Sequence, residues 1–133
     1  MISFGGVGKL GEDLAVRFLK DKGWDILKRN YRKNYGEIDI IARKGEKLGF
    51  FEIKAVSCEI IGNVGKETFL EDRPEERVDS AKLRKIRKII ETYFFEKKLN
   101  FEDIEWEFGI LSVFVDEAGK RAYVKFLEDF PLE

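Results

Sequence analysis

Three acidic residues and one lysine stand out because they fall within apolar, strand-like sequence. Residues 37–42 alternate acidic and aliphatic side chains, and Glu52 and Lys54 close a second, largely apolar run. The short polar segment between the two runs contains Gly45, which is typical of a hairpin turn. We therefore expect a β-hairpin over residues 35–55 that carries acidic side chains within its strands.

The expected register brings these charges onto one face of the hairpin. With a two-residue or four-residue turn around Gly45, Asp39 falls opposite Glu52 and Glu37 falls opposite Lys54; a three-residue turn would shift this register. Two opposed carboxylates repel each other and destabilise a strand pair. A bound cation, a shared proton or the ammonium group of Lys54 must offset that repulsion. The hairpin is therefore the candidate functional site.

Composition limits the chemistry available to the chain. Its 133 residues suit one domain with a hydrophobic core. The charged share is 38%, well above the roughly 25% of ordinary domains, but 25 basic residues balance 26 acidic ones. The net charge of -1 gives no general support for nucleic-acid binding, so any such argument must come from local clusters.

The chain contains no histidine and a single cysteine, Cys58. These facts exclude a Ser-His-Asp system, a Cys-His nucleophile and any zinc site with histidine ligands. Catalysis would have to use Asp, Glu, Lys or Tyr, with a hard divalent cation as a suitable helper. One cysteine allows no intrachain disulfide, which favours a cytoplasmic location. We expect no signal peptide and no membrane span, because no apolar run approaches about 20 residues.

The remaining chain predicts an α/β fold in the order α-β-β-β-α-β-β, a single domain over residues 1–133 with a mixed central sheet flanked by helices. Helical periodicity covers residues 9–22, with an apolar stripe of Leu10, Leu14, Phe18 and Leu19, and residues 81–98, with Asp79 or Ser80 as N-cap. Strands are expected over residues 24–29, 37–42, 48–54, 104–115 and 121–126. Residues 30–36 read as a polar connection, and residues 56–78 read as a long flexible loop.

Several motifs resemble those of the YraN-type family of small bacterial proteins. The matching segments are Gly11-Glu12 with Ala15, residues 23–30 (GWDILKRN), residues 35–42 (YGEIDIIA), residues 51–54 (FEIK), and Val78 with Lys82, Arg84 and Ile86. They occur in order from about residue 8 to residue 115. The resemblance implies a restriction-endonuclease-like fold of the PD-(D/E)xK type, related to archaeal Holliday-junction resolvases.

The resemblance also implies roles for individual residues. Asp39 matches the metal-binding aspartate, Glu52 and Lys54 match the ExK pair, and Glu12 matches an acid on the first helix. We expect Asp39, Glu52 and Glu12 to bind Mg²⁺, for which Mn²⁺ can substitute, and all four residues to take part in catalysis. The chain departs from the family at Ala55-Val56, where Thr-Arg is common, and at Gly109, in a strand that often carries an aspartate.

The resulting prediction is a metal-dependent nuclease acting on DNA, with branched or damaged DNA as candidate substrates. Basic residues expected to contact phosphates are Arg29, Arg32, Lys33, Lys82 and Arg84. Two alternatives remain open: a non-catalytic nucleic-acid-binding module, and a protein-interaction domain that uses the strand near Trp106. Glu12 could be a simple helix N-terminal acid, and Glu37 is expected to pair with Lys54. The basic face of the second helix, around Lys82 and Arg84, could be a solvated surface. A homodimer is expected by analogy with the resolvases.

Overall fold

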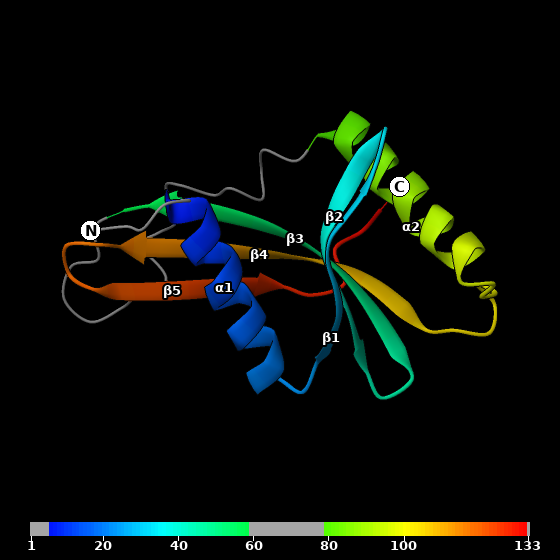
Figure 1. The fold of residues 1–133 in the computed structure, drawn as a ribbon, viewed down its shortest axis with the longest axis horizontal. Helices are drawn as coiled ribbons and strands as arrows, with labels where there is room; N and C mark the ends of the chain where they lie inside the picture. The colour runs from blue at the N-terminus through cyan, green and yellow to red at the C-terminus, as the bar shows by residue number, and fades with distance from the viewer. Residues whose placement is uncertain (1–5, 59–78, 133) are drawn as a thin grey trace.

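The computed structural model describes residues 6–58 and 79–132. Within these ranges, two helices and five strands follow one another as α1 (Gly6–Asp21), β1 (Asp25–Lys33), β2 (Gly36–Lys44), β3 (Lys47–Ser57), α2 (Ser80–Glu96), β4 (Trp106–Asp116) and β5 (Arg121–Leu127) (Figure 1). The predicted α-β-β-β-α-β-β order is therefore confirmed. Of the predicted 56–78 loop, residues 56 and 57 belong to β3, and residues 59–78 lie outside the described residues.

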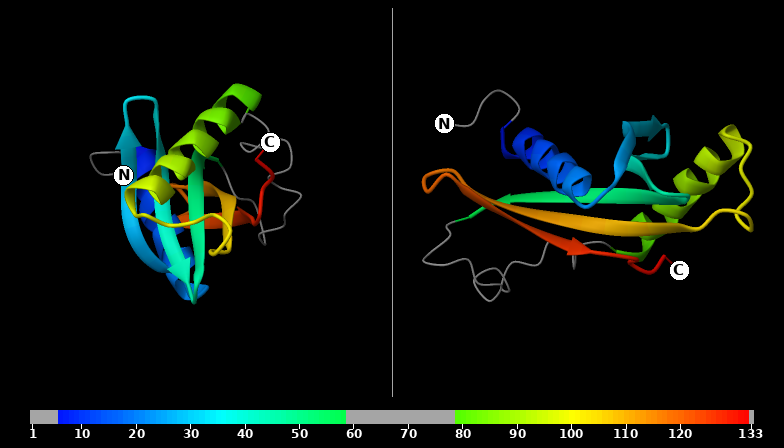
Figure 2. Two further views of the ribbon diagram at one scale, coloured as in Figure 1. Left: turned by 90° about the vertical axis from the view of Figure 1, so that its right-hand side faces the viewer. Right: turned by 90° about the horizontal axis from the view of Figure 1, so that it is seen from below.

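The five strands form one open mixed sheet in the order β1-β2-β3-β4-β5. Only β3 and β4 are parallel; the other three neighbouring pairs are antiparallel. The sheet is strongly twisted, so that the β1–β2 hairpin turns away from the β4–β5 hairpin on either side of β3 (Figure 1, Figure 2). This divergence creates the setting of the candidate site.

The two helices pack on opposite faces of the sheet. Adjacent residues of a strand point to opposite faces, and Phe50 packs in the cluster that contains α2 whereas Phe51 packs in the cluster that contains α1. The helical periodicity predicted for residues 81–98 is confirmed: α2 buries Ile86, Ile89, Ile90, Tyr93 and Phe94, and Leu83 is partly buried. The helix begins where expected, because the Asp79 side chain accepts a hydrogen bond of 2.8 Å from the Lys82 backbone N–H.

The predicted stripe of α1 is partly wrong. Leu19 is fully buried, and Leu14 and Phe18 are partly buried against the same core, as expected. Leu10 is 38% exposed, and the other buried side chains are Ala15 and Val16. The reason is a close approach of helix and sheet. A Cβ atom added at Gly11 would lie 2.5 Å from the Cβ of Ala55 on β3, so small residues, rather than large aliphatic ones, form the contact there.

The first strand extends further than its sequence predicts. Residues 30–33 were expected in a connection, but they continue β1, and Tyr31 in this segment is only 7% exposed. Two irregularities hide the strand pattern: a register shift between Ile26 and Lys28, and a positive φ of 55° at Asn30. The β1–β2 turn is therefore shortened to Asn34 and Tyr35.

Trp106, at the start of β4, packs among aromatic side chains. Its ring lies edge-on to Phe50, Phe94 and Phe101 at centroid separations of 5.8 to 6.2 Å. Aromatic rings in such clusters contribute to core stability. Trp106 is therefore partly buried against the core beneath α2, and the protein-interaction role of its strand stays a prediction.

Candidate active site

The site lies at a fork in the sheet, where β2 and β3 separate. The two strands pair from Lys44↔Lys47 to Ile40↔Phe51, so the predicted turn and register are confirmed over this part. The regular ladder ends there, before the expected pairs of Asp39 with Glu52 and of Glu37 with Lys54. Asp39 adjoins Ile40, the last residue of β2 in this ladder. Beyond the ladder, β2 and β3 run in different directions (Figure 1).

Asp39 continues the connection between the strands through its side chain. Its Oδ2 atom accepts a hydrogen bond of 2.7 Å from the backbone N–H of Ile53 on β3. The carboxylate therefore occupies a place that a backbone carbonyl would fill in a continuous ladder. This contact fixes the orientation of Asp39 and leaves its other oxygen atom available.

Glu52 is the next residue along β3 and lies on the face toward α2. Glu52 is only 7% exposed, and a glutamate this buried is rare unless it has charged partners. Two lysines supply them: Lys54 Nζ lies 3.3 Å and Lys82 Nζ lies 2.6 Å from Glu52 Oε2. Glu52 and Lys54 share a face because they are two residues apart on one strand, whereas Lys82 enters from the first turn of α2.

Burial makes the electrostatics of this cluster unusual. Desolvation, followed by the negative charge of Glu52, raises the pKa of Asp39 to about 7; the hydrogen bond from Ile53 opposes this shift. Burial also lowers the pKa of Lys54, and the neighbouring ammonium of Lys82 adds to that effect. Burial acts in the same direction on Lys82, but hydrogen bonds to Glu52 and Lys54 outweigh it, so the pKa of Lys82 is raised.

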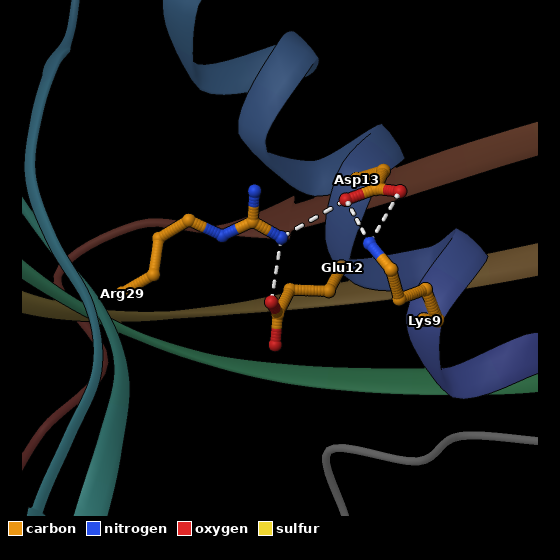
Figure 3. Close-up of polar contacts among 4 residues, drawn as sticks. All are labelled: Lys9, Glu12, Asp13 and Arg29. Atoms are coloured by element: carbon orange, nitrogen blue, oxygen red, sulfur yellow. Dashed lines mark hydrogen bonds and ion pairs between the residues drawn. The ribbon is translucent and has the colours of Figure 1, made fainter. Parts of the chain in front are cut away.

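Glu12 lies near this cluster but is held by a different partner. Its Oε1 atom lies 2.5 Å from Arg29 Nη2 of β1, and the same guanidinium nitrogen lies 3.0 Å from Asp13 Oδ1 (Figure 3). Lys9 completes the network with an ion pair of 3.2 Å to Asp13. Glu12 still contributes to the raised pKa of Asp39, so the two carboxylates lie within electrostatic range of each other.

The donor set suits a hard cation with few protein ligands. Throughout residues 6–58 and 79–132, no group of three or more Asp, Glu or Cys side chains is assembled to hold a metal ion. Half-buried Asp39 and buried Glu52 supply two carboxylates, and lysine ammonium groups now offset part of their negative charge. Mg²⁺ characteristically takes one or two carboxylates and retains several waters, so these two residues fit it. Glu12 as a third ligand stays a prediction.

The basic residues that sequence assigns to phosphate contacts lie in two environments. Those of β1 are ion-paired on the protein surface: Arg29 with Glu12, Arg32 with Glu37 at 2.7 Å, and Lys33 with Glu96 at 2.6 Å. Those of α2 differ, since Lys82 contacts Glu52 while Arg84 is exposed. The expected pairing of Glu37 with Lys54 is wrong, because Arg32 is its Cα partner across β1 and β2 and takes its carboxylate.

The contact of Lys82 with Glu52 is the feature of the site that sequence reasoning missed. Lys82 was expected to face DNA, yet its ammonium forms an ion pair with the Glu52 carboxylate. A partial signal exists in the sequence: basic residues crowd the first half of α2, where they oppose the helix dipole and do not serve helix stability.

Two departures from the family pattern have structural explanations. Ala55 faces Gly11 at the tight contact between α1 and β3, where a larger side chain has little room. A Cβ atom at Gly109 would lie 3.0 Å from Phe51 Cδ1 and 3.1 Å from the Leu127 carbonyl oxygen. An aspartate at position 109 would thus be forced into the core, so its absence suits the packing of this chain.

These observations define a class: an α/β domain with an open five-stranded mixed sheet, two helices, and a carboxylate–lysine cluster at a fork in that sheet. The family model described as "Uncharacterised protein family UPF0102" matches residues 11–113. This chain belongs to the UPF0102 (YraN) family. The matched segment contains Glu12, Asp39, Glu52 and Lys54.

Relatives from distant bacteria support the assignment. A UPF0102 protein of Dictyoglomus turgidum is 40% identical over 114 residues, which cover 86% of each chain. One from Thermotoga petrophila is 41% identical over 91 residues, covering 68% of this chain and 73% of the relative. One from Campylobacter jejuni subsp. doylei is 44% identical over 95 residues, covering 70% and 72%.

The predicted lack of a membrane span agrees with the part of the chain that the structure describes. Neither α1 nor α2 combines the length and apolar character needed to cross a bilayer.

Proposed function

We propose that this protein is a metal-dependent nuclease that hydrolyses phosphodiester bonds in DNA, with branched or damaged DNA as its substrate class. The observation that carries the proposal is the pair of half-buried Asp39 and buried Glu52 at the sheet fork, together with two lysine ammonium groups. The resemblance to PD-(D/E)xK nucleases in the order Asp39, Glu52, Lys54 supports it. The cytoplasm, where a chain with one cysteine needs no oxidising environment, is the proposed location.

Asp39 and Glu52 would hold a Mg²⁺ ion, with Mn²⁺ as a substitute. The ion supplies Lewis-acid stabilisation of the phosphate and lowers the pKa of water. Asp39 is pre-oriented for this role, because the Ile53 N–H fixes one carboxylate oxygen and leaves the other available. Glu12 would join them as a ligand or as an acceptor for ordered water once Arg29 releases it, for instance to a phosphate of the substrate.

Lys54 would place the attacking water and stabilise the charge that develops on the phosphate. Its ammonium now pairs with Glu52 at 3.3 Å, so it can turn toward a substrate without leaving the site. Arg29, Arg32, Lys33, Lys82 and Arg84 are proposed to hold the DNA backbone. Most of them exchange an internal carboxylate partner for phosphate in doing so, which makes binding sensitive to salt.

The test is cleavage of flap, junction and single-stranded DNA by the purified protein with Mg²⁺ or Mn²⁺. Asp39→Asn and Glu52→Gln remove a charge while keeping side-chain volume, so each should reduce cleavage by about a hundredfold or more. Arg17→Gln, an exposed change on α1, is the matched control and should retain cleavage. Equal cleavage by all three variants would assign the activity to a contaminant and overturn the proposal.

One observation favours a second candidate, a non-catalytic nucleic-acid-binding module. Arg29 neutralises Glu12, and two lysines neutralise Glu52, so the acidic residues are satisfied internally. Such a protein would bind DNA or RNA with strong salt dependence and would cut neither. Metal binding distinguishes the two candidates. If the protein is a nuclease, calorimetric titration with Mg²⁺ should give a binding signal that Asp39→Asn abolishes.

A homodimer remains part of the proposal, by analogy with the resolvases. Sedimentation equilibrium at micromolar concentration tests it directly, since a monomer has a mass of 15.6 kDa. A two-fold dimer would present two copies of the fork to a branched substrate.

A further inference from the structure

A hollow of about 270 Å³ adjoins the candidate active site. It lies between the β1–β2 turn and α2, and it shares Glu52 and Lys82 with the carboxylate cluster. Tyr35 from the turn and Ile86 from the helix form part of its apolar lining. A group bound in the hollow would therefore lie beside any phosphate held at Asp39 and Glu52.

The apolar wall of the hollow is held in place. The Tyr35 hydroxyl and Thr92 Oγ1 are 2.5 Å apart, and the Lys88 ammonium lies 4.7 Å from the Tyr35 ring centroid. Gly36 has a φ of +150°, and a Cβ atom there would lie 2.7 Å from Ile89 Cδ1. The turn thus packs directly against α2 and presents a fixed aromatic ring to the hollow.

The charges of the hollow suit a ligand with an anionic group. Glu37 and Glu52 line it, but each is ion-paired, with Arg32 and Lys82 respectively. Lys85 is exposed and, within the described part of the chain, has no ion-pair partner. Lys82, Lys85, Ile86 and Ile89 follow i, i+3, i+4, i+7 spacing, so one face of α2 supplies both cationic and apolar lining.

We propose that this hollow binds a single unpaired nucleotide of the substrate strand, adjacent to the scissile phosphate. The base would lie against Tyr35 and Ile86, and its phosphate would meet Lys85. The hollow is smaller than the roughly 300 to 1,000 Å³ pockets of drug-sized ligands, which suits one nucleotide rather than a base pair. A paired base would have to leave the stack to enter it, so the preferred substrates are single-stranded, flap or mismatched DNA. This inference rests on the proposed nuclease function.

The direct test uses the full chain without metal. ¹H–¹⁵N NMR titration with thymidine 5′-monophosphate should shift the Gly36 and Lys85 amide signals. Inorganic phosphate and thymidine serve as separate probes, and each should bind at least about tenfold more weakly than the nucleotide. If phosphate alone binds as well as the nucleotide, the site is a simple anion site and the proposal fails.

Variants separate the hollow from general electrostatics. Lys85→Ala should weaken nucleotide binding about five- to tenfold, whereas Arg87→Ala, which removes a charge from the same helix outside the hollow, should leave it unchanged. Tyr35→Phe keeps the ring and should retain binding; Tyr35→Ala should lose it. Dispersed amide signals show that each variant is folded. Equal losses for Lys85→Ala and Arg87→Ala would overturn the proposal.

Cleavage assays distinguish failure of this inference from failure of the nuclease proposal. If the nucleotide binds at Gly36 and Lys85 but no DNA is cut with Mg²⁺, the nucleotide-binding proposal is supported and the nuclease proposal is wrong. If paired duplex is cut as fast as flap DNA and the nucleotide shifts neither amide signal, the nuclease proposal is supported and the nucleotide-binding proposal is wrong.

Discussion

Asp39 occupies a position that is unfavourable for an ionised carboxylate, because it is half-buried and lies within electrostatic range of the Glu52 charge. Its side chain nevertheless replaces a backbone contact between β2 and β3 through the Ile53 N–H. A local arrangement that sacrifices stability in this way is characteristic of functional sites. We therefore expect folding stability to depend on whether the Asp39 carboxylate binds a proton or a cation.

Stability should fall as the pH rises from 5 to 8. The folded protein holds the Asp39 proton up to a pKa of about 7, whereas the unfolded chain releases it near the ordinary aspartate pKa of 3.8. The folded state therefore binds more protons in this range, and the unfolding free energy decreases by roughly 2 to 3 kcal/mol. Urea unfolding at pH 5 and pH 8 measures this change, and Mg²⁺ should restore stability at pH 8 more than at pH 5.

Asp39→Asn should remove this fall in stability, because the amide does not titrate. Asp13→Asn is the control: a hydrogen bond from Arg29 lowers the pKa of Asp13, so that carboxylate stays ionised throughout pH 5 to 8. A pH dependence that persists in Asp39→Asn would assign the effect to another group.

Lys82 is expected to compete with a divalent cation for Glu52. Its ammonium lies 2.6 Å from Oε2, so a cation bound there must displace or face this positive charge. Lys82→Gln should tighten Mg²⁺ binding by about tenfold, equivalent to roughly 1.4 kcal/mol, as measured by calorimetric titration. Arg87→Gln, on the same helix but paired with Glu91, should have no effect. Weaker Mg²⁺ binding in Lys82→Gln would show that Lys82 supports the metal site instead.

The sequence predicts part of this site because part of it is local. Asp39, Glu52 and Lys54 lie on one hairpin, and strand alternation with a short turn is enough to bring them together. The contact of Lys82 with Glu52 joins a strand and a helix 30 residues apart in sequence, and no local pattern encodes such a distance. The end of the β2–β3 ladder was likewise not predictable, because it depends on the twist of the whole sheet.

At the scale of elements, α1 is positioned by the small residues at its contact with β3. Gly11 and Ala55 allow a separation that larger side chains would prevent, and this packing brings Glu12 toward the fork. The sequence stripe of large apolar residues was right for Leu14, Phe18 and Leu19, which pack in this core, but wrong for Leu10, which is 38% exposed. The length of β1 was underestimated because its register shift and the positive φ of Asn30 interrupt the period-2 pattern.

Substitutions at two glycines of α1 should have opposite effects. Gly11→Ala places a methyl group 2.5 Å from the Ala55 Cβ atom, and we expect a loss of about 1 to 3 kcal/mol in unfolding free energy. Gly8→Ala meets no atom within 4 Å, so only helix propensity acts, with a gain of up to about 1 kcal/mol. Urea unfolding of both variants measures the difference. If Gly11→Ala were as stable as Gly8→Ala, the helix could shift without consequence, and the position of Glu12 would be less constrained.

At the scale of the whole molecule, an overall charge near zero conceals a separation of charge. The first half of α2 is strongly basic and borders the fork. An open hollow of about 610 Å³ near the β2–β3 turn is instead lined mainly by acidic residues, Glu46, Asp103, Glu105, Glu107 and Glu128, with Lys44, Lys47 and Trp24. Strand spacing places Lys47 and Glu52 roughly 17 Å apart along β3. DNA, as a polyanion, should therefore approach the basic first half of α2 and avoid the acidic hollow near the β2–β3 turn.

This orientation predicts which lysines and arginines control the salt dependence of DNA binding. Arg84 is exposed on the basic half of α2, so Arg84→Ala should weaken binding of single-stranded DNA about equally for all sequences and reduce the slope of log K against log salt by about 0.7. Lys20→Ala, at the far end of α1, removes the same charge and should leave both quantities unchanged. Fluorescence anisotropy from 50 to 300 mM salt measures both. Because both variants alter the net charge identically, equal slopes would mean that DNA responds to overall charge alone, and the proposed orientation would be wrong.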